Sequence, residues 1–566
     1  MAIKAITQQE LTIERNNTKE GVDPLTDGIE YETRSSKITE PDGTVVFEMY
    51  DIEAPKSWSQ LAIDIAASKY FKRAQVPTKS GRETSIKQMI TRVTSTLRQF
   101  GEEHNYFATE EDAQAFEDEL NHLLITQKGA FNSPVWFNCG LFHKYGIKGN
   151  KPGTYFYNLE TDQVEECEDS YSHAQCSACF IQKIEDSLDS IYELITNESK
   201  IFKFGSGTGS NFSSIRGAGE KLSGGGFSSG LMSYLRILDR SAAAVKSGGI
   251  TRRAAKMVVL DMDHPQIEEY INWKVKEEEK VRALIAAGYP SDFNGEAYAT
   301  VSGQNSNNSV MIPDSFMQAV LEDKEWNTTE RTTGKVVKTY KARELMKQIS
   351  EAAWHCADPG VMFYDQMNKW HTCSNSEHIH STNPCGEYLF IDNTACNLAS
   401  INLMKFIDNE NNFDIESFKY ACRLFFIAQE IMVDFGSYPT KAIVQGSHNF
   451  RTIGLGFANL GTLLMTEGIP YDSDKARAIA GAISAIQTGH AYKTSAEIAR
   501  IKGPFPKYEE NKEPMLKVMK QHRDAAYKMD VRHCPEYLLE AAREEWDKVV
   551  EDGEKYGFRN AQATVI

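Results

Sequence analysis

The segment Asn383-Pro384-Cys385-Gly386-Glu387 constrains this chain more than any other. Proline fixes its own φ at about −65° and disfavours helix at the residue before it, while glycine tolerates tight turns. The segment therefore predicts a tight finger, not a helix or a central strand. In such a finger an amide, a thiol and a carboxylate at alternate positions can converge on one polar ligand. This set suits redox or radical chemistry, and the alternative is a turn with a buried cysteine.

Seven further segments along the sequence carry recognisable motifs. Together with Asn383–Glu387 they resemble the large, catalytic chain of ribonucleotide reductases, over roughly residue 55 to the end. The N-P-C-G-E spelling resembles the adenosylcobalamin-dependent class II enzymes in particular. The segments are Phe131–Phe137, Cys176–Ile181, Phe204–Ser213, Gly248–Ala255, Gly303–Ser309, Ala395–Leu403 and Arg451–Gly461.

The resemblance implies a role for each group of the finger. Cys385 would form the thiyl radical that removes the 3′ hydrogen of the ribose, and Glu387 would be the general base at the 3′-hydroxyl. Asn383 would orient the ribose through its amide. Two electrons would come from the thiols of Cys179 and Cys396, which can form a disulfide only if their Cα atoms lie within about 7 Å.

The same resemblance implies adenosylcobalamin as cofactor, a ribonucleotide substrate, nucleotide effectors and an external, thioredoxin-like dithiol reductant. It also implies a homodimer. Two alternatives stay open. One is a class I-type catalytic subunit that uses a separate metal-radical subunit, and the other is a nucleotide-binding fragment without turnover.

Substrate and effector contacts are expected in short polar loops. The glycine-rich segment Gly205–Gly209 has no Walker lysine and matches the dinucleotide fingerprint poorly, so its assignment rests on the resemblance. For Ser133 the alternative to a substrate contact is a turn at a helix terminus. For Arg252 and Arg253 the alternative to an effector contact is a solvated surface loop. The expected substrate contacts are Ser133, Ser177, Ala178, Gly207, Gly209 and Asn383, and the expected effector contacts are Arg252, Arg253, Gln304 and Asn305.

Two cysteine patterns allow other readings. Cys176 and Cys179 form a C-x-x-C, which by itself fits a thioredoxin-like pair or half of a zinc site. The residues His371, Cys373, His378 and His380 could supply four metal ligands. No second C-x-x-C or H-x₃-H follows at finger spacing, so no structural metal is expected.

Hydrophobic periodicity predicts the domain plan. Residues 1–54 show no sustained period and predict an extended or loosely attached arm. Residues 55–130 predict a helical N-terminal domain, and residues 131–566 predict a catalytic α/β domain in which strands alternate with helices. Strands are expected at 177–182, 256–261, 309–312, 361–364, 388–391 and 398–403, and helices near 184–202, 226–247, 341–356, 414–436, 474–500 and 535–550.

The family resemblance implies a ten-stranded α/β barrel made of two five-stranded parallel halves, with the finger in its middle. This chain would supply only the first part of that barrel, because it stops after the strand-like run 560–566. The expectation is therefore the N-terminal part of a split or interrupted reductase. The C-terminal half would be a separate chain or a spliced continuation.

The formal net charge of −17 argues against binding of nucleic acid, because a polyanion is repelled by it at long range. No apolar run is long enough to cross a membrane. The N-terminus lacks the apolar core of a secretory signal, so the expected location is the cytoplasm.

Overall fold

The computed structural model describes residues 10–39, 43–245, 254–293, 295–410 and 412–564. The chain divides into two compact units. Unit 1 is formed by residues 1–178 and 395–566, and unit 2 by residues 179–394.

The N-terminal segment of unit 1 is ordered by hydrogen bonds to the fully buried carboxylate of Glu119. The backbone amides of Asn17 and Thr18 donate to Glu119 Oε1 at 2.8 Å each, and both side chains also donate to this carboxylate. Strands β1 (Tyr31–Thr39) and β2 (Val45–Pro55) then form an antiparallel hairpin. These contacts attach the segment, and the hairpin is extended, while the predicted boundary of the arm at residue 54 stays a prediction. A buried carboxylate needs donors, and this segment supplies them.

The predicted helices of residues 55–130 are present. They are α1 (Gln60–Ile65), α2 (Ile86–Glu103) and α3 (Glu110–Ile125). Ser85 and Gln88 form a capping box at the start of α2, and Thr109 caps α3.

The rest of unit 1 combines a small sheet with long helices. Strand β15 (Thr394–Asn402) runs parallel to β16 (Ile453–Ala458), which runs parallel to β17 (Ala563–Thr564), and β3 (Gly129–Phe131) pairs antiparallel with β15. The remaining elements are a π-helix (Ala66–Tyr70), α4 (Ser133–Asn138), α5 (Leu141–Tyr145), β4 (Tyr155–Asn158), β5 (Gln163–Glu166), a 3₁₀-helix (Leu403–Lys405), α14 (Ile415–Phe435), α15 (Lys441–Phe450), α16 (Leu460–Thr466), α17 (Asp474–Lys502), α18 (Tyr508–Tyr527) and α19 (Glu536–Tyr556).

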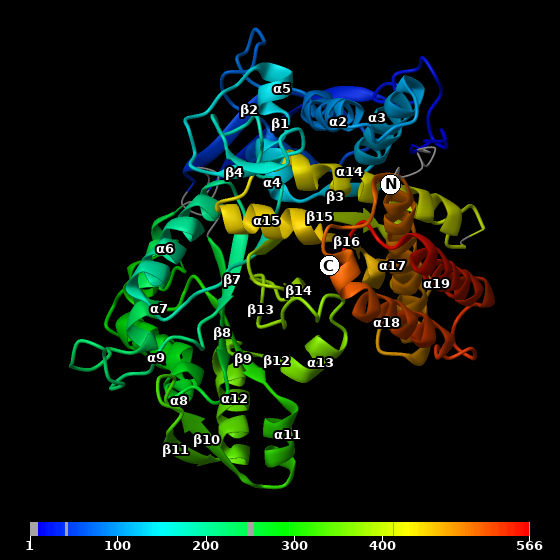
Figure 1. The fold of residues 1–566 in the computed structure, drawn as a ribbon. Helices are drawn as coiled ribbons and strands as arrows, with labels where there is room; N and C mark the ends of the chain where they lie inside the picture. Colours follow the sequence, from blue (N-terminus) through cyan, green and yellow to red (C-terminus); the bar gives the residue numbers. More distant parts are fainter. Residues whose placement is uncertain (1–9, 40–42, 246–253, 294, 411, 565–566) are drawn as a thin grey trace. The chain divides into compact units, whose positions relative to one another are not determined.

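Unit 2 is built on a parallel sheet with the order β12-β9-β8-β7-β6 (Figure 1). The strands follow one another through helical crossovers, as a parallel sheet requires. This sheet confirms the predicted α/β class. Its strands are β6 (Cys179–Ile181), β7 (Gly207–Asn211), β8 (Ala255–Asp261), β9 (Asn307–Ile312) and β12 (Gly360–Phe363).

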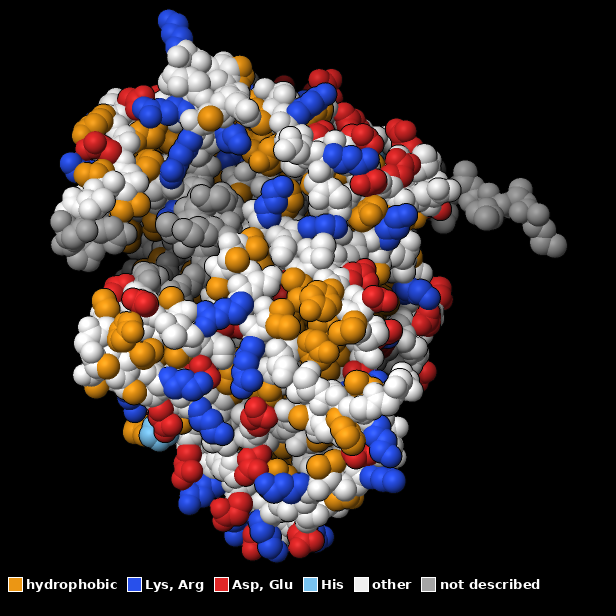
Figure 2. Space-filling model, turned by 90° about the vertical axis from the view of Figure 1, so that its left-hand side faces the viewer, with side chains coloured by type: hydrophobic (Ala, Val, Ile, Leu, Met, Phe, Trp, Pro, Cys, Tyr) orange, Lys and Arg blue, Asp and Glu red, His pale blue; other side chains and the backbone are white. Residues whose placement is uncertain are grey.

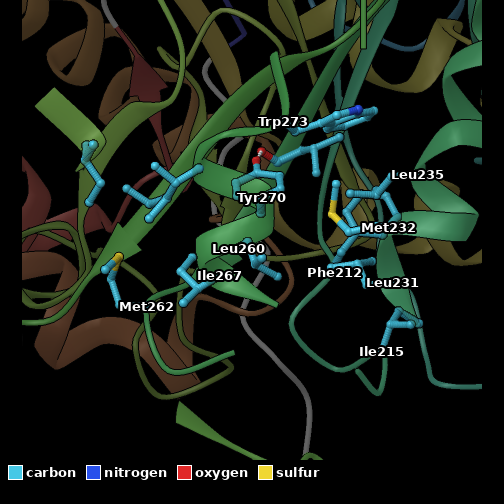
Figure 3. Packing of buried hydrophobic residues seen from close by; sticks show 14 of the residues in the cluster. Phe212, Ile215, Leu231, Met232, Leu235, Leu260, Met262, Ile267, Tyr270 and Trp273 are labelled. Atoms are coloured by element: carbon cyan, nitrogen blue, oxygen red, sulfur yellow. Dashed lines mark hydrogen bonds between the residues drawn. The ribbon is translucent and has the colours of Figure 1, made fainter. Parts of the chain in front are cut away.

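The connections of unit 2 carry its helices, two antiparallel hairpins and its core. One apolar cluster is formed by side chains such as Phe212, Leu235 and Trp273, and Tyr270 donates its hydroxyl to Val258 O at 2.8 Å (Figure 3). Each buried side chain of this kind contributes about 1.5–3 kcal/mol. The elements are α6 (Leu188–Lys203), α7 (Leu231–Ala244), α8 (Ile267–Ile271), α9 (Trp273–Ala286), α10 (Glu296–Thr300), α11 (Asp314–Leu321), β10 (Glu325–Thr329), β11 (Val336–Lys341), α12 (Ala342–Cys356), α13 (Tyr364–Lys369), β13 (Ser381–Thr382) and β14 (Leu389–Phe390).

Basic and acidic side chains are interspersed on the face drawn in Figure 2. Within the described ranges, no helix is both long and apolar enough to span a bilayer.

Candidate active site

The predicted finger is an antiparallel β-hairpin. Strand β13 pairs with β14, with Thr382 opposite Leu389. The side chain of Asn383 closes the tip, because its Oδ1 accepts hydrogen bonds from the amides of Gly386 at 3.2 Å and Tyr388 at 2.9 Å. Gly386 has φ +89°, in the region that favours glycine. We call residues 381–390 the finger hairpin.

The finger hairpin packs against β7 of the parallel sheet (Figure 1). A Cβ atom on Gly209 would lie 1.8 Å from the carbonyl oxygen of Thr382, and one on Gly207 would lie 2.6 Å from the ring of Pro384. Only glycine allows this approach. Gly207-Thr208-Gly209 was expected as a glycine-rich loop, yet it is a central strand. Its predicted contact with substrate stays a prediction.

Three of the predicted catalytic residues form one hydrogen-bonded chain. The Asn383 amide Nδ2 donates to Cys179 Sγ at 3.0 Å, and Cys179 Sγ donates to Glu387 Oε1 at 3.5 Å. The side chains of Asn383 and Cys179 are buried, while Glu387 is half-buried. These hydrogen bonds link the Asn383 amide, the Cys179 thiol and the Glu387 carboxylate. The proton of the Cys179 thiol therefore has an acceptor within reach.

Cys385 lies at the tip of the finger hairpin and is exposed. Eight of the other nine cysteines are buried, and Cys356 is intermediate. Among the ten cysteines, all within the described ranges, the residue that the sequence singles out is therefore the most exposed.

The two thiols of the C-x-x-C pattern have different partners. The thiol of Cys176 hydrogen bonds with that of Cys139 in unit 1, and this bond together with burial raises the pKa of Cys176 well above its usual range. The thiol of Cys179 instead hydrogen bonds with Asn383 and Glu387. None of the ten cysteines, all of which lie in the described ranges, forms a disulfide.

Cys396 lies on β15 in unit 1 and is fully buried. Its carbonyl oxygen accepts a hydrogen bond from the amide of Ala178 at 3.1 Å. Ala178 directly precedes Cys179 in the sequence, so the backbone next to one predicted redox cysteine is bonded to the other.

The two serines that were predicted to contact substrate have different surroundings. Ser133 begins α4 and is half-buried, with its hydroxyl 3.1 Å from that of Tyr70. Ser177 is buried and hydrogen bonds with the Tyr438 side chain. A substrate would reach Ser133 more easily than Ser177.

The predicted effector residues are only partly described. Arg252 and Arg253 lie outside the described residues. Gln304 is half-buried, and Asn305 donates its backbone amide to Asp239 Oδ1 at 2.9 Å.

Asn211 and Asp261 were not among the predicted site residues. Asn211 ends β7, and its Nδ2 donates to Asp261 Oδ1 and to the carbonyl of His380, both at 2.9 Å. Burial raises the pKa of Asp261. This clamp fixes the entry of the finger hairpin to the carboxyl ends of β7 and β8, where parallel sheets commonly bind ligands. For Asp261, the position at the end of the predicted strand 256–261 was the available signal.

The residues considered for zinc make protein contacts. His371 Nε2 lies 2.8 Å from Glu377 O, and burial lowers the pKa of His371 to about 4. Within the part of the chain that the structure describes, no group of three or more His, Cys, Asp or Glu side chains could hold a metal ion.

Comparison with protein-family models gives two matches. Residues 177–566 match "Ribonucleotide reductase, barrel domain", and residues 32–127 match "Class II vitamin B12-dependent ribonucleotide reductase". The first match confirms the predicted fold. The second begins earlier than the expected residue 55 and includes the β1–β2 hairpin.

The chain is also similar to curated proteins. It is 50% identical over 95% of its length to a vitamin B12-dependent ribonucleotide reductase of Rhodopirellula baltica, of which it covers 51%. It is 46% identical over 98% of its length to such a reductase of Streptomyces coelicolor, of which it covers 55%. A vitamin B12-dependent ribonucleoside-diphosphate reductase of Mycobacterium tuberculosis is 32% identical over 59% of the chain, which covers 45% of it. The chain thus spans about half the length of these relatives.

Proposed function

Because the chain belongs to the class II, vitamin B12-dependent ribonucleotide reductase family, we propose that it carries the radical thiol of an enzyme that reduces ribonucleotides to 2′-deoxyribonucleotides. One observation supports this most. The finger hairpin presents Cys385 at its exposed tip, directly beside the hydrogen-bonded chain of Asn383, Cys179 and Glu387.

Cys385 acts on the ribose 3′ carbon in this proposal. As a thiyl radical it takes the 3′ hydrogen atom, and it returns a hydrogen atom to the same carbon at the end of the cycle. Glu387 accepts the proton of the 3′-hydroxyl and later returns it, while the 2′-hydroxyl takes a proton from a thiol of the reducing pair and leaves as water. The hydrogen bond from Cys179 keeps Glu387 close to a thiol that can also donate a proton.

Cys179 and Cys396 supply the two electrons in this proposal. Their two thiols release two protons and two electrons to the substrate radical, and one disulfide forms between the two sulfurs. The hydrogen bond between Ala178 and the Cys396 carbonyl supports the pairing. An external dithiol then reduces the disulfide and resets the enzyme.

Asn383 has a second task besides the predicted orientation of the ribose. Its amide closes the hairpin tip and contacts Cys179, and its side chain is fully buried. We propose that the main role of Asn383 is to position the hairpin tip and the Cys179 thiol. A bound substrate would contact Asn383 only at the exposed side of the tip.

Adenosylcobalamin fits this arrangement because the sulfur that it must reach is exposed. When bound, this cofactor supplies the radical that removes a hydrogen atom from a thiol. The residues of this chain then hold the thiol in place and keep the base and the reducing thiol beside it.

The substrate and partners are part of the proposal. We propose a ribonucleotide substrate, nucleotide effectors and a homodimer, as the family resemblance implies. The Mycobacterium tuberculosis relative is named as a diphosphate reductase, which favours a diphosphate substrate here. The expectation of a C-terminal half as a separate chain or spliced continuation stays a prediction.

The test is turnover by the full-length protein. With adenosylcobalamin, a dithiol and a ribonucleoside diphosphate, we expect deoxynucleotide formation measured by liquid chromatography, and none without the cofactor. Cofactor-independent turnover with an added metal-radical subunit would favour the class I-type alternative. Nucleotide binding without turnover under either condition would favour the inactive alternative.

A further inference from the structure

Tyr70 is the last residue of the π-helix Ala66–Tyr70 in unit 1, and its hydroxyl lies 3.1 Å from that of Ser133. The amide of Phe71 donates to the carbonyl of Ala66 at 3.0 Å, which is the i→i+5 bond of this wider turn. Such turns are rare and frequently lie at functional sites. At this turn the Tyr70 side chain extends to Ser133, the first residue of α4.

A buried guanidinium fixes the π-helix against α4. Arg92 is fully buried and donates to the carbonyl of Tyr70 at 3.1 Å. It also donates to the carbonyls of Trp136 in α4 at 2.5 Å and of Cys139, the C-cap of α4, at 2.7 Å. Glu83 neutralises it across 2.8 Å. Because a buried cation needs its acceptors, Tyr70 cannot move away from α4 without leaving a donor of Arg92 unpaired.

The ring of Tyr70 also packs against α4. Its centroid lies 5.5 Å from that of Phe137 and 6.4 Å from that of Trp136, separations at which aromatic rings attract one another. The Tyr70 hydroxyl is thus held at Ser133 by contacts in which the hydroxyl itself takes no part. Replacement of Tyr70 by phenylalanine would remove the hydroxyl and keep these contacts.

The two hydroxyls share one hydrogen bond and leave one O–H proton for a ligand. Within the described ranges, Tyr70 is the sole hydrogen-bond partner of the Ser133 hydroxyl. The phenol is the more acidic group and therefore the better donor, so Tyr70 donates and Ser133 accepts. The proton of the half-buried Ser133 is then free for a further acceptor. An anionic oxygen is the acceptor that binds such a donor most strongly.

We propose that Tyr70 is a positioning residue that orients the Ser133 hydroxyl toward a phosphate of the bound nucleotide. Tyr70 acts through Ser133 and does not touch the ligand. Its hydroxyl therefore strengthens the binding of a phosphorylated ligand and has no effect on the bare nucleoside. This inference rests on the proposed function, because it assumes that a ribonucleotide is the substrate and that Ser133 contacts it.

The test compares the binding of CDP and cytidine to the full-length protein without cofactor, by isothermal titration calorimetry. The variants are Tyr70→Phe, Ser133→Ala and the double variant. Tyr157→Phe is the matched control, because the Tyr157 hydroxyl also donates to a side chain of unit 1, that of Asp162, at 2.7 Å.

We expect Tyr70→Phe to raise the Kd of CDP about fivefold, the effect of losing one neutral hydrogen bond. Ser133→Ala should raise this Kd about tenfold or more, because a charge-assisted hydrogen bond is lost. The double variant should match Ser133→Ala, since Tyr70 acts only through that hydroxyl. Cytidine should bind equally well to all variants, and Tyr157→Phe should bind CDP as the wild type does.

Three results would overturn the role of Tyr70. The first is an unchanged Kd of CDP in Tyr70→Phe. The second is an equal loss of affinity for CDP and cytidine, which would indicate a general structural role. The third is an additive loss in the double variant, which would show that Tyr70 does not act through Ser133.

Turnover separates this inference from the proposed function. Tyr70→Phe should raise KM about fivefold and keep kcat within about twofold of the wild type. Binding as expected in a protein without turnover would count against the proposed function alone. Normal turnover with the same Kd and KM in Tyr70→Phe and wild type would count against the role of Tyr70 alone.

Discussion

The Asn383 side-chain amide donates a hydrogen bond to the sulfur of Cys179 at 3.0 Å, and these residues are 204 positions apart in the sequence. The tip of the finger hairpin is thereby bonded to the first residue of β6. Since Cys179 also donates to Glu387, the thiol is held between two residues of the same hairpin. The predictions below follow from this arrangement and from the buried charges of unit 1.

Replacement of the exposed tip thiol should abolish chemistry without loss of fold. We expect Cys385→Ser to lower deoxynucleotide formation by at least about a thousandfold, because a hydroxyl does not replace the thiyl radical. The melting temperature should stay the same, since the side chain is exposed. Cys356→Ser, at the half-buried cysteine of α12, should keep its turnover. Normal activity of Cys385→Ser would refute its role.

The two cysteines of the C-x-x-C pattern should behave differently. Cys179→Ser should allow at most one turnover with a dithiol reductant, because the electron-donating pair loses one thiol. Cys176→Ser should keep multiple turnovers, since the Cys176 thiol contacts Cys139 in unit 1. The number of deoxynucleotides formed per enzyme measures the difference. Equal loss in both variants would show that the pattern works as a pair.

A methyl group on the central glycine of β7 should displace the finger hairpin. The Cβ of Gly209→Ala would lie 1.8 Å from Thr382 O, so the hairpin must move. We expect a loss of about 2 kcal/mol in the free energy of unfolding and a large loss of turnover. Gly224→Ala is the control, because nothing lies within 4 Å of its Cβ. Chemical denaturation and kcat check both, and a fully active Gly209→Ala would contradict the packing.

Glu545 should make stability depend on pH. Burial opposes its charge, but hydrogen bonds from His490 and Lys419 and the nearby charges lower its pKa from 4.5 to about 2. A lowered folded-state pKa means that this stabilisation is present above pH 4.5 and is lost as the pH falls toward 2. The contribution is about 3 kcal/mol.

Denaturation of Glu545→Gln at several pH values should therefore show a weaker loss of stability in acid than the wild type. Glu544→Gln, at an exposed neighbour on the same helix, should follow the wild type. An unchanged pH profile in Glu545→Gln would exclude this role.

The buried cation of unit 1 should contribute more to stability than a surface cation. Arg451 is fully buried and pairs with Glu430 at 2.6 Å and Asp434 at 2.8 Å. Arg451→Met leaves the buried carboxylates of Glu430 and Asp434 without their main opposite charge. We therefore expect the free energy of unfolding to fall by about 3–5 kcal/mol. Arg477→Met removes only exposed pairs and should cost less than about 1 kcal/mol. Similar losses in the two variants, measured by denaturation, would contradict this ranking.

Local chemistry in the sequence determined a large part of this structure. Proline and glycine around Cys385 act on their own backbone and predict a tight tip, which the structure contains. Capping residues and apolar periodicity likewise act within a few positions, so the helices of residues 55–130 and the α/β alternation could be predicted. The family resemblance added the expected roles of the cysteines, which stay predictions.

Tertiary structure decided the features that depend on contacts between distant residues. Gly207 and Gly209 carry no side-chain pattern of a strand, and they lie in β7 because their backbone pairs with β6 and β8. The absence of a Cβ lets the finger hairpin pack beside them. The hydrogen bonds of Asn17 with Glu119 and of Cys176 with Cys139 likewise join residues that are distant in the sequence. Burial and hydrogen-bond satisfaction are summed over the whole fold, so no local window of the sequence contains them.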